Sequence, residues 1–219
     1  MEWYCWPGVD MNQASDETPI VHIVDDDNSQ RCGLDSLLRS VGLTAKTYGS
    51  TQEFLKADRL DGPGCIVLDI RLPGVNGLDF QEELGSLGIR LPVVLMTGHG
   101  DIPMSVRAMK AGAIDFLPKP FRDQDMIDAV TAAITLNRQQ RASETEAVAV
   151  TDRYATLSPR EREVMALVTA GRMNKQIAAD LGLSEVTVKI HRGAAMRKMG
   201  ARSLVDLVRM ADALKSKSD

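Results

Sequence analysis

The chain has 219 residues, 44% of them apolar, and a net charge of −4, values typical of a globular protein with one large or two modest domains. No apolar run approaches the roughly 20 residues that span a bilayer, and the start lacks the basic and apolar regions of a secretory signal, so we expect a cytoplasmic protein. Cys5, Cys32 and Cys65 are odd in number and widely spaced, which argues against a disulfide framework and against a metal-binding cysteine cluster.

Residues 1–19 precede the first predicted strand and contain both tryptophans of the chain, Trp3 and Trp6. We expect a disordered N-terminal extension there. The alternative is that translation begins at Met11, because the sequence from that residue onward is a natural start for the domain that follows.

Short β-prone runs alternate with helical patterns in the next segment, residues 20–136. Stretches such as Ser29 to Val41 have apolar residues at helical spacing. The predicted strands are Ile20 to Val24, Thr44 to Tyr48, Cys65 to Leu68, Pro92 to Met96 and Ile114 to Leu117. This alternation predicts an α/β fold, a doubly wound five-stranded parallel sheet with helices on both faces.

Polar side chains follow the predicted strands at their carboxyl ends, where such sheets bind ligands. They are Asp25, Asp26, Asp27, Asp69, Thr97 and Lys119. Converging carboxylates need a hard cation, and Mg²⁺ prefers one or two carboxylates together with phosphate oxygens and water. An aspartate could attack a phosphoryl group, while the lysine and the hydroxyl stabilise its oxygens. The pattern therefore predicts a Mg²⁺-dependent phosphoryl-transfer site.

The segment 137–156, "NRQQRASETEAVAVTDRYAT", is polar and lacks a strong apolar period, so we expect a helix extension followed by a linker. It separates two oppositely charged parts of the chain. Residues 20–136 have 11 Lys and Arg against 16 Asp and Glu, and residues 158–219 have 12 against 7. Net charges of −5 and +5 indicate different partners for the two parts.

The basic part, residues 157–219, is helical throughout by pattern and predicts an all-α, four-helix domain. Ser158, Pro159 and Glu161 form a predicted capping box for the first helix, which Gly171 ends. A short helix runs from Asn174 to Gly182, a third begins after Ser184, and "SLVDLVRMADAL" is the fourth. Two short helices joined by a glycine-containing turn are typical of a helix-turn-helix.

Basic residues on the predicted third helix are Lys189, Arg192, Arg197 and Lys198, and Lys175 begins the second helix. On a recognition helix they would neutralise DNA phosphates, while the side chains deepest in the groove would meet base edges. A solvated basic face on a small helical bundle is the alternative.

The motifs "VDDD", "VLDIRLPGVNGLDF" and "VVLMTGHGDIPMSVRAMKAGAIDFLPKPF" resemble, in order and spacing, the CheY-like receiver domain of two-component response regulators, particularly the FixJ-like group. The resemblance covers residues 20–136. It implies that Asp69 accepts a phosphoryl group from a sensor histidine kinase. It further implies that Asp26, Asp69 and the backbone carbonyl of Arg71 bind Mg²⁺ with help from Asp25, that Thr97 and Lys119 contact the phosphoryl oxygens, and that Phe116 moves with Thr97 as a switch.

The stretch "LSPREREVMALVTAGRMNKQIAADLGLSEVTVKIHRGAAMRKM" resembles the LuxR-type DNA-binding domain along its whole length. By position, Lys189 and Ile190 would face the bases, with Thr187 and His191 nearer the backbone. Some relatives have a base-contacting lysine where this chain has Gly193, and whether Arg192 compensates stays open.

Together, the two resemblances imply a transcriptional regulator that is not a turnover enzyme. Phosphorylation would promote a homodimer through Val106 and Lys110, two helix-turn-helix units would bind paired half-sites in promoter DNA, and the dimer would contact RNA polymerase.

Two alternatives belong to other functional classes. A Mg²⁺-dependent phosphatase usually has a second aspartate two positions after its nucleophile, where this chain has Arg71. A receiver joined to an RNA-binding or protein-binding output is the other alternative.

Smaller predictions concern single residues. We expect a cis peptide bond between Lys119 and Pro120, and packing or loop roles for His22 and His99. Asp27 should point to solvent near the N-terminus of the first helix. Phe116 could also be an ordinary core residue.

Overall fold

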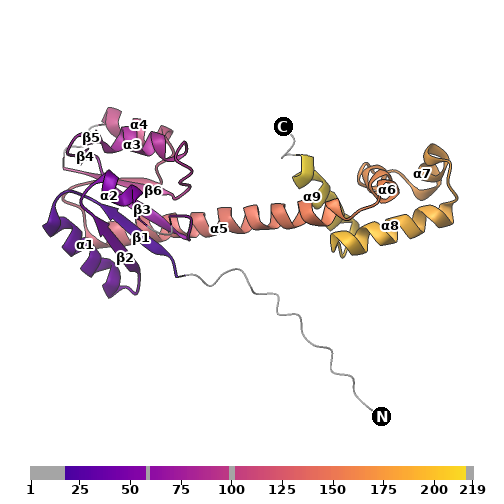
Figure 1. Cartoon of the computed structure of the whole chain (residues 1–219), viewed down its shortest axis with the longest axis horizontal. Helices are drawn as coiled ribbons and strands as arrows, with labels where there is room; N and C mark the ends of the chain where they lie inside the picture. Colours follow the sequence, from indigo (N-terminus) through magenta and orange to yellow (C-terminus); the bar gives the residue numbers. More distant parts are fainter. Residues whose placement is uncertain (1–17, 58–59, 99–101, 216–219) are drawn as a thin grey trace, which may run out of the picture. The chain divides into compact units, whose positions relative to one another are not determined.

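A computed structural model describes residues 18–57, 60–98 and 102–215 (Figure 1). The predictions for residues 1–17 and for His99 lie outside the described residues. Backbone contacts divide the chain into two compact units that meet between Arg141 and Ala142. In the described part of the chain, no helix is long and apolar enough to cross a membrane.

The first unit contains the predicted five-stranded parallel sheet, with strand order β2-β1-β3-β6-β7. Its strands are β1 (Ile20–Val24), β2 (Thr44–Tyr48), β3 (Gly64–Asp69), β6 (Val93–Thr97) and β7 (Asp115–Pro118). The order reverses between β1 and β3, where the ligand site of such a sheet is expected. The doubly wound fold is therefore confirmed.

Helices cover both faces of the sheet (Figure 1). α1 (Asn28–Ser40) and the first part of α5 (Asp123–Ala155) pack on one face, and Leu38 and Met126 lie fully buried there. α2 (Thr51–Leu55), α3 (Gly77–Leu84) and α4 (Ile102–Lys110) pack on the other face, where Phe54 is fully buried. The first unit therefore has three layers, with the apolar side chains of the sheet enclosed on both sides.

The structure also contains a short hairpin that the sequence pattern did not predict. β4 (Arg71–Leu72) pairs antiparallel with β5 (Val75–Asn76) directly after β3. Gly74, in the tight turn between them, has a φ of 79°, a conformation that glycine adopts without strain. The hairpin holds the chain beside the carboxyl end of the sheet.

The expected linker within residues 137–156 is wrong, because α5 continues as a single helix to Ala155. The segment contains neither glycine nor proline and is rich in alanine, glutamate, glutamine and arginine, which favour helix. It lacks an apolar period because most side chains between 138 and 148 are exposed, so no face has to be apolar there.

The second unit begins within α5 and continues with four helices, α6 (Pro159–Thr169), α7 (Asn174–Leu181), α8 (Glu185–Met199) and α9 (Leu204–Lys215). The predicted capping box is present: the Ser158 hydroxyl accepts from the Glu161 backbone, and Glu161 accepts from the Ser158 backbone. Ile177, Val188 and Met199 are fully buried in its core. The predicted four-helix domain is therefore confirmed.

His22 packs in the core of the first unit, as predicted. Its ring stacks on Tyr48 and meets Phe54 edge-on, and its Nδ1 lies 3.0 Å from the Tyr48 hydroxyl. Burial and the nearby Lys46 ammonium lower the pKa of His22 to about 4. The imidazole is therefore neutral at physiological pH.

Candidate functional site

Three carboxylates meet at the carboxyl end of the sheet. Asp25 directly follows β1 and is fully buried, Asp69 ends the neighbouring β3, and Asp26 is exposed beside them. An oxygen of each carboxylate lies within 4.8 Å of the others. Because adjacent parallel strands end at the same edge, residues 44 positions apart in the sequence become neighbours.

Lys119 reaches into this acidic cluster from the end of β7. Its ammonium donates to Asp25 Oδ2 and to Asp69 Oδ2, at 2.8 Å in both cases. Burial acts to lower the pKa of Lys119, but the hydrogen bonds and charges of the two carboxylates outweigh it, so the pKa is raised. The side chain therefore keeps its positive charge. The peptide bond before Pro120 is cis, as predicted.

The backbone fixes the remaining oxygens of the two buried carboxylates. Asp25 Oδ1 accepts from the Asp27 backbone at 2.8 Å, and Asp69 Oδ1 accepts from the Arg71 backbone at 3.1 Å. Gly77 lies close to the backbone of Asp69, since a Cβ at that position would be 2.4 Å from the Asp69 carbonyl oxygen. The Arg71 backbone therefore orients the side chain of Asp69, the predicted phosphoacceptor, and the close approach of Gly77 positions its backbone.

Asp27 has a role different from its two neighbours. It is exposed, as predicted, and it is also the N-cap of α1. Its carboxylate accepts from the backbone of Ser29 at 2.7 Å and of Gln30 at 3.3 Å. Asp27 therefore satisfies the free amides of the helix terminus instead of joining the acidic cluster.

The donor set of the cluster suits Mg²⁺, which prefers carboxylate, carbonyl and water oxygens. Asp26 and Arg71 line the same open hollow at the sheet edge, next to the β4–β5 hairpin. Arg71, whose carbonyl was predicted as a ligand, is thus adjacent to the carboxylates. The exposure of Asp26 leaves an aqueous approach to this side of the cluster.

The two predicted switch residues lie on neighbouring strands. Thr97 ends β6 and is fully buried, and its carbonyl accepts from the Lys119 backbone at 2.7 Å. Phe116 lies in β7, is half-buried, and packs against the hydrophobic cluster to which Met104 of α4 also contributes. Thr97 is thus hydrogen-bonded to the residue that follows β7, and Phe116 of β7 shares a hydrophobic cluster with α4.

The predicted dimer residues lie on the outer side of α4. Val106 is 46% exposed and Lys110 is exposed. Between them, Arg107 donates to Asp79 at 2.7 Å and to Glu82 at 2.9 Å, both on α3. The two carboxylates raise the pKa of Arg107.

In the second unit, α7 and α8 form the predicted helix-turn-helix. Gly182 closes α7 in the left-handed conformation, with a φ of 65°, and Ser184 caps α8 through the Thr187 backbone. Lys189 and Ile190 are exposed on α8, as base-contacting side chains would have to be. Thr187 and His191 are half-buried beside them, and Lys175 is exposed on α7.

Two basic residues of α8 are bound to the protein instead of facing outward freely. The Lys198 ammonium contacts Glu161 at 2.7 Å and the Thr156 carbonyl at 3.3 Å, and this ion pair lowers the pKa of Glu161. Arg192 donates to Asn174 of α7 at 3.3 Å. The sequence could not reveal these contacts, because each joins residues on different helices.

A sheet edge with an aspartate between carboxylates and a lysine, in a chain with a helix-turn-helix unit, defines the class of response regulators with a DNA-binding output. The chain matches the family described as the response regulator receiver domain over residues 21–131 and the luxR family of bacterial regulatory proteins over residues 155–211. It therefore belongs to the response regulators that join a receiver to a LuxR-type DNA-binding domain.

Similar proteins match over nearly the whole chain. Nodulation protein W of Bradyrhizobium diazoefficiens is 52% identical over 209 residues, which cover 95% of this chain and 92% of that protein. The transcriptional regulatory protein FixJ of Azorhizobium caulinodans is 46% identical, with 87% and 90% covered. The solved structure of the response regulator StyR is 45% identical, with a TM-score of 0.78 and 90% and 99% covered.

Proposed function

We propose that phosphorylation of Asp69 by a sensor histidine kinase in the cytoplasm controls promoter binding by the second unit. The observation that carries this proposal is the position of the Asp69 carboxylate, between the acidic cluster and the Lys119 ammonium. The Arg71 backbone and the Lys119 ammonium hold this carboxylate in one orientation, which favours its use as a nucleophile.

The proposed reaction transfers a phosphoryl group between two residues. A carboxylate oxygen of Asp69 attacks the phosphorus of a phosphohistidine, the new P–O bond forms, and the P–N bond breaks with the kinase histidine as leaving group. Asp25, Asp26, Asp69 and the Arg71 carbonyl would hold Mg²⁺, which when bound neutralises charge on the phosphoryl oxygens. The Lys119 ammonium and the Thr97 hydroxyl would donate to the same oxygens.

The added charge supports a switch because Lys119 already contacts Asp69 and is joined to Thr97 through the backbone. In our proposal the Thr97 hydroxyl turns toward the phosphoryl group and Phe116 moves inward behind it. The surface of α4 and β7 then changes and two chains associate through Val106 and Lys110.

A dimer would present two helix-turn-helix units to paired half-sites in duplex DNA. Lys189 and Ile190 would contact bases, and Lys175, Thr187, His191 and Arg192 would lie nearer the backbone. Linking two units raises affinity through effective concentration without new contacts. Contact of the bound dimer with RNA polymerase would then change transcription, and the chain would act as a regulator rather than a turnover enzyme.

The test compares wild type with Asp69→Asn and Asp69→Ala, treated with a small-molecule phosphodonor and Mg²⁺. We expect wild type alone to gain mass by one phosphoryl group, to dimerise and to shift promoter DNA more strongly. Asp152→Asn, the same change at an exposed position of α5, should behave as wild type. Unchanged dimerisation and binding of wild type after treatment would refute the proposal, and steady hydrolysis of an unrelated phosphoester would favour a phosphatase instead.

A further inference from the structure

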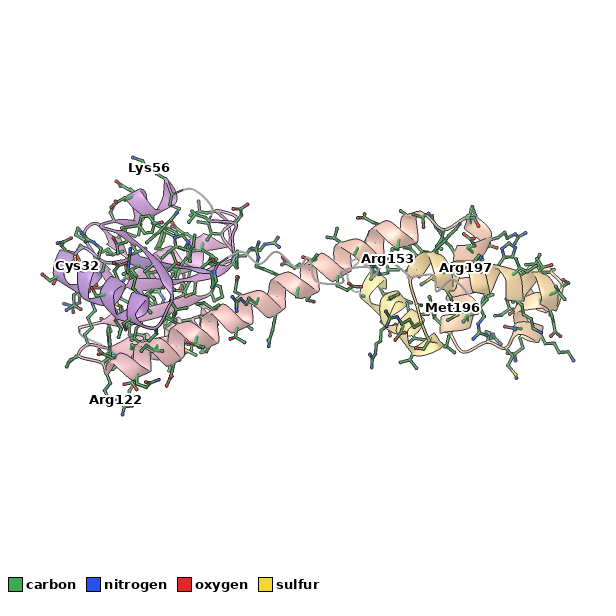
Figure 2. The ribbon with its side chains drawn as sticks, turned by 90° about the horizontal axis from the view of Figure 1, so that it is seen from below. Cys32, Lys56, Arg122, Arg153, Met196 and Arg197 are labelled. Carbon is green, nitrogen blue, oxygen red and sulfur yellow. The ribbon has the colours of Figure 1, made fainter. Side chains whose placement is uncertain are left out.

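One face of α8 combines a glycine with an arginine one turn later. Val188, Ala195 and Met199 are buried on the inner side of this helix. At 3.6 residues per turn, the opposite side carries Val186, Ile190, Gly193 and Arg197. Val186 and Ile190 are 66% and 64% exposed, and Arg197 is exposed as well (Figure 2 labels Arg197).

The guanidinium of Arg197 lies over the backbone of Gly193. A Cβ atom placed at Gly193 would have Arg197 Nη1 at 3.7 Å, and apart from the adjacent helix backbone no other atom within 4 Å. The reason is geometric: side chains on a helix tilt toward its N-terminus, so residue i+4 covers the turn that contains residue i. A Cβ atom at Gly193 would be in ordinary van der Waals contact with this guanidinium, and the glycine leaves the surface of this turn to Arg197 alone.

Of the two arginines of α8, Arg197 is the one whose guanidinium is not hydrogen-bonded to another described residue of the protein. Arg192 donates to Asn174, and the neighbouring Lys198 is paired with Glu161. Within the described ranges, the Arg197 side chain makes no hydrogen bond or ion pair, so none of its five N–H donors is used by a protein acceptor. An exposed guanidinium on the outer face of a recognition helix can bind DNA without first breaking a protein contact.

We propose that Arg197 takes the place of a side chain at position 193 and reads a guanine in the major groove through N7 and O6. The inference rests on the proposed DNA-binding function. A base edge suits this face better than a phosphate, because Val186 and Ile190 on the same stripe are apolar and can contact thymine methyl groups. The planar guanidinium fork matches the two guanine acceptors.

The experiment starts with a duplex pool of random sequence, from which the full-length protein with phosphodonor and Mg²⁺ selects its site. On that site, we expect Arg197→Ala to weaken binding by about 10- to 100-fold and to lose the preference for one guanine. Replacing that guanine by 7-deazaguanine should weaken wild type but not Arg197→Ala. Arg209→Ala, the same charge loss at an exposed position of α9, should retain the preference.

A second variant tests whether Arg197 occupies the space that a side chain at position 193 would otherwise fill. Gly193→Lys in the Arg197→Ala background should recover most of the lost affinity, since a side chain from 193 would again fill the space. No recovery would overturn this part of the proposal.

Two further results would overturn the guanine contact itself. Arg197→Ala could weaken binding equally for all DNA sequences and lower the slope of log affinity against log salt concentration by about one. That result would mean that Arg197 contacts a DNA phosphate instead of a base. Selection of a site that Arg197→Ala binds as wild type does would exclude any role. If wild type selects no duplex at all, the proposed DNA binding fails together with this inference.

Discussion

Replacing Lys119 by methionine tests the electrostatics of the acidic cluster directly. The change removes one ammonium and leaves Asp25 and Asp69 buried without it, while a similar side-chain volume remains. A hydrogen bond to a charged group contributes about 1.5–3 kcal/mol, so two contacts give an upper range of about 3–6 kcal/mol. The Lys119 side chain is 16% exposed and water partly screens both pairs. We therefore expect the free energy of unfolding to fall by about 2–4 kcal/mol without Mg²⁺.

Mg²⁺ should reverse much of this loss. Without the competing ammonium the three carboxylates bind a cation more tightly, so added Mg²⁺ should stabilise Lys119→Met more than wild type. Removing one carboxylate as well, in Lys119→Met with Asp25→Asn, should recover part of the stability in EDTA.

The assay is urea unfolding of the full chain followed by circular dichroism, in EDTA and in excess Mg²⁺. Lys56→Met is the matched control, because Lys56 is exposed on the surface of the first unit (Figure 2). Equal unfolding free energies for the two variants in EDTA, or a smaller effect of Mg²⁺ on Lys119→Met than on wild type, would refute the reasoning.

The remaining predictions concern four other side chains. Asp27→Ala should cost about 1 kcal/mol of unfolding free energy through loss of the α1 cap and leave phosphorylation intact, whereas Asp26→Ala should change stability little and weaken Mg²⁺ binding, measured by titration. The pKa of His22 is about 4 in the folded protein against 6.5 in the unfolded chain, so below pH 6.5 only the unfolded chain binds a proton at this residue. The free energy of unfolding should therefore be highest above pH 6.5 and fall by roughly 3 kcal/mol as the pH approaches 4. His22→Phe should reduce this loss of stability between pH 6.5 and 4. Glu161→Gln keeps the capping hydrogen bond but loses the ion pair with Lys198, so it should lower the melting temperature at neutral pH, and the difference should vanish as the pH falls through the lowered pKa of Glu161.

The acidic edge could be predicted because it depends on topology alone. Once the βα alternation is recognised, the ends of parallel strands must meet, and Asp25, Asp69 and Lys119 must approach one another. The capping of α6 was also visible, since Ser158 and Glu161 are only three residues apart. In both cases the determining pattern is either local or repeated along the chain.

The contacts of Arg192 and Lys198 could not be predicted, because they depend on how helices pack. Lys198 pairs with a glutamate 37 residues earlier, and nothing in the spacing of charges distinguishes it from the exposed Arg197 next to it. The β4–β5 hairpin was missed for another reason: strands of two residues are too short to show a period.

The continuation of α5 affects how the two units can be separated or recombined. Val150, near its end, is buried in the core of the second unit, and Tyr154 stacks under the Arg162 guanidinium of α6. A DNA-binding fragment that begins at residue 155, where the luxR-family match begins, would therefore lack Val150 and Tyr154, which pack in the core of the second unit. Chimeras that exchange receivers should instead be joined within the exposed residues 142–146, with the helix continued in register across the junction. Each of the two units then keeps all the buried residues of its own hydrophobic core.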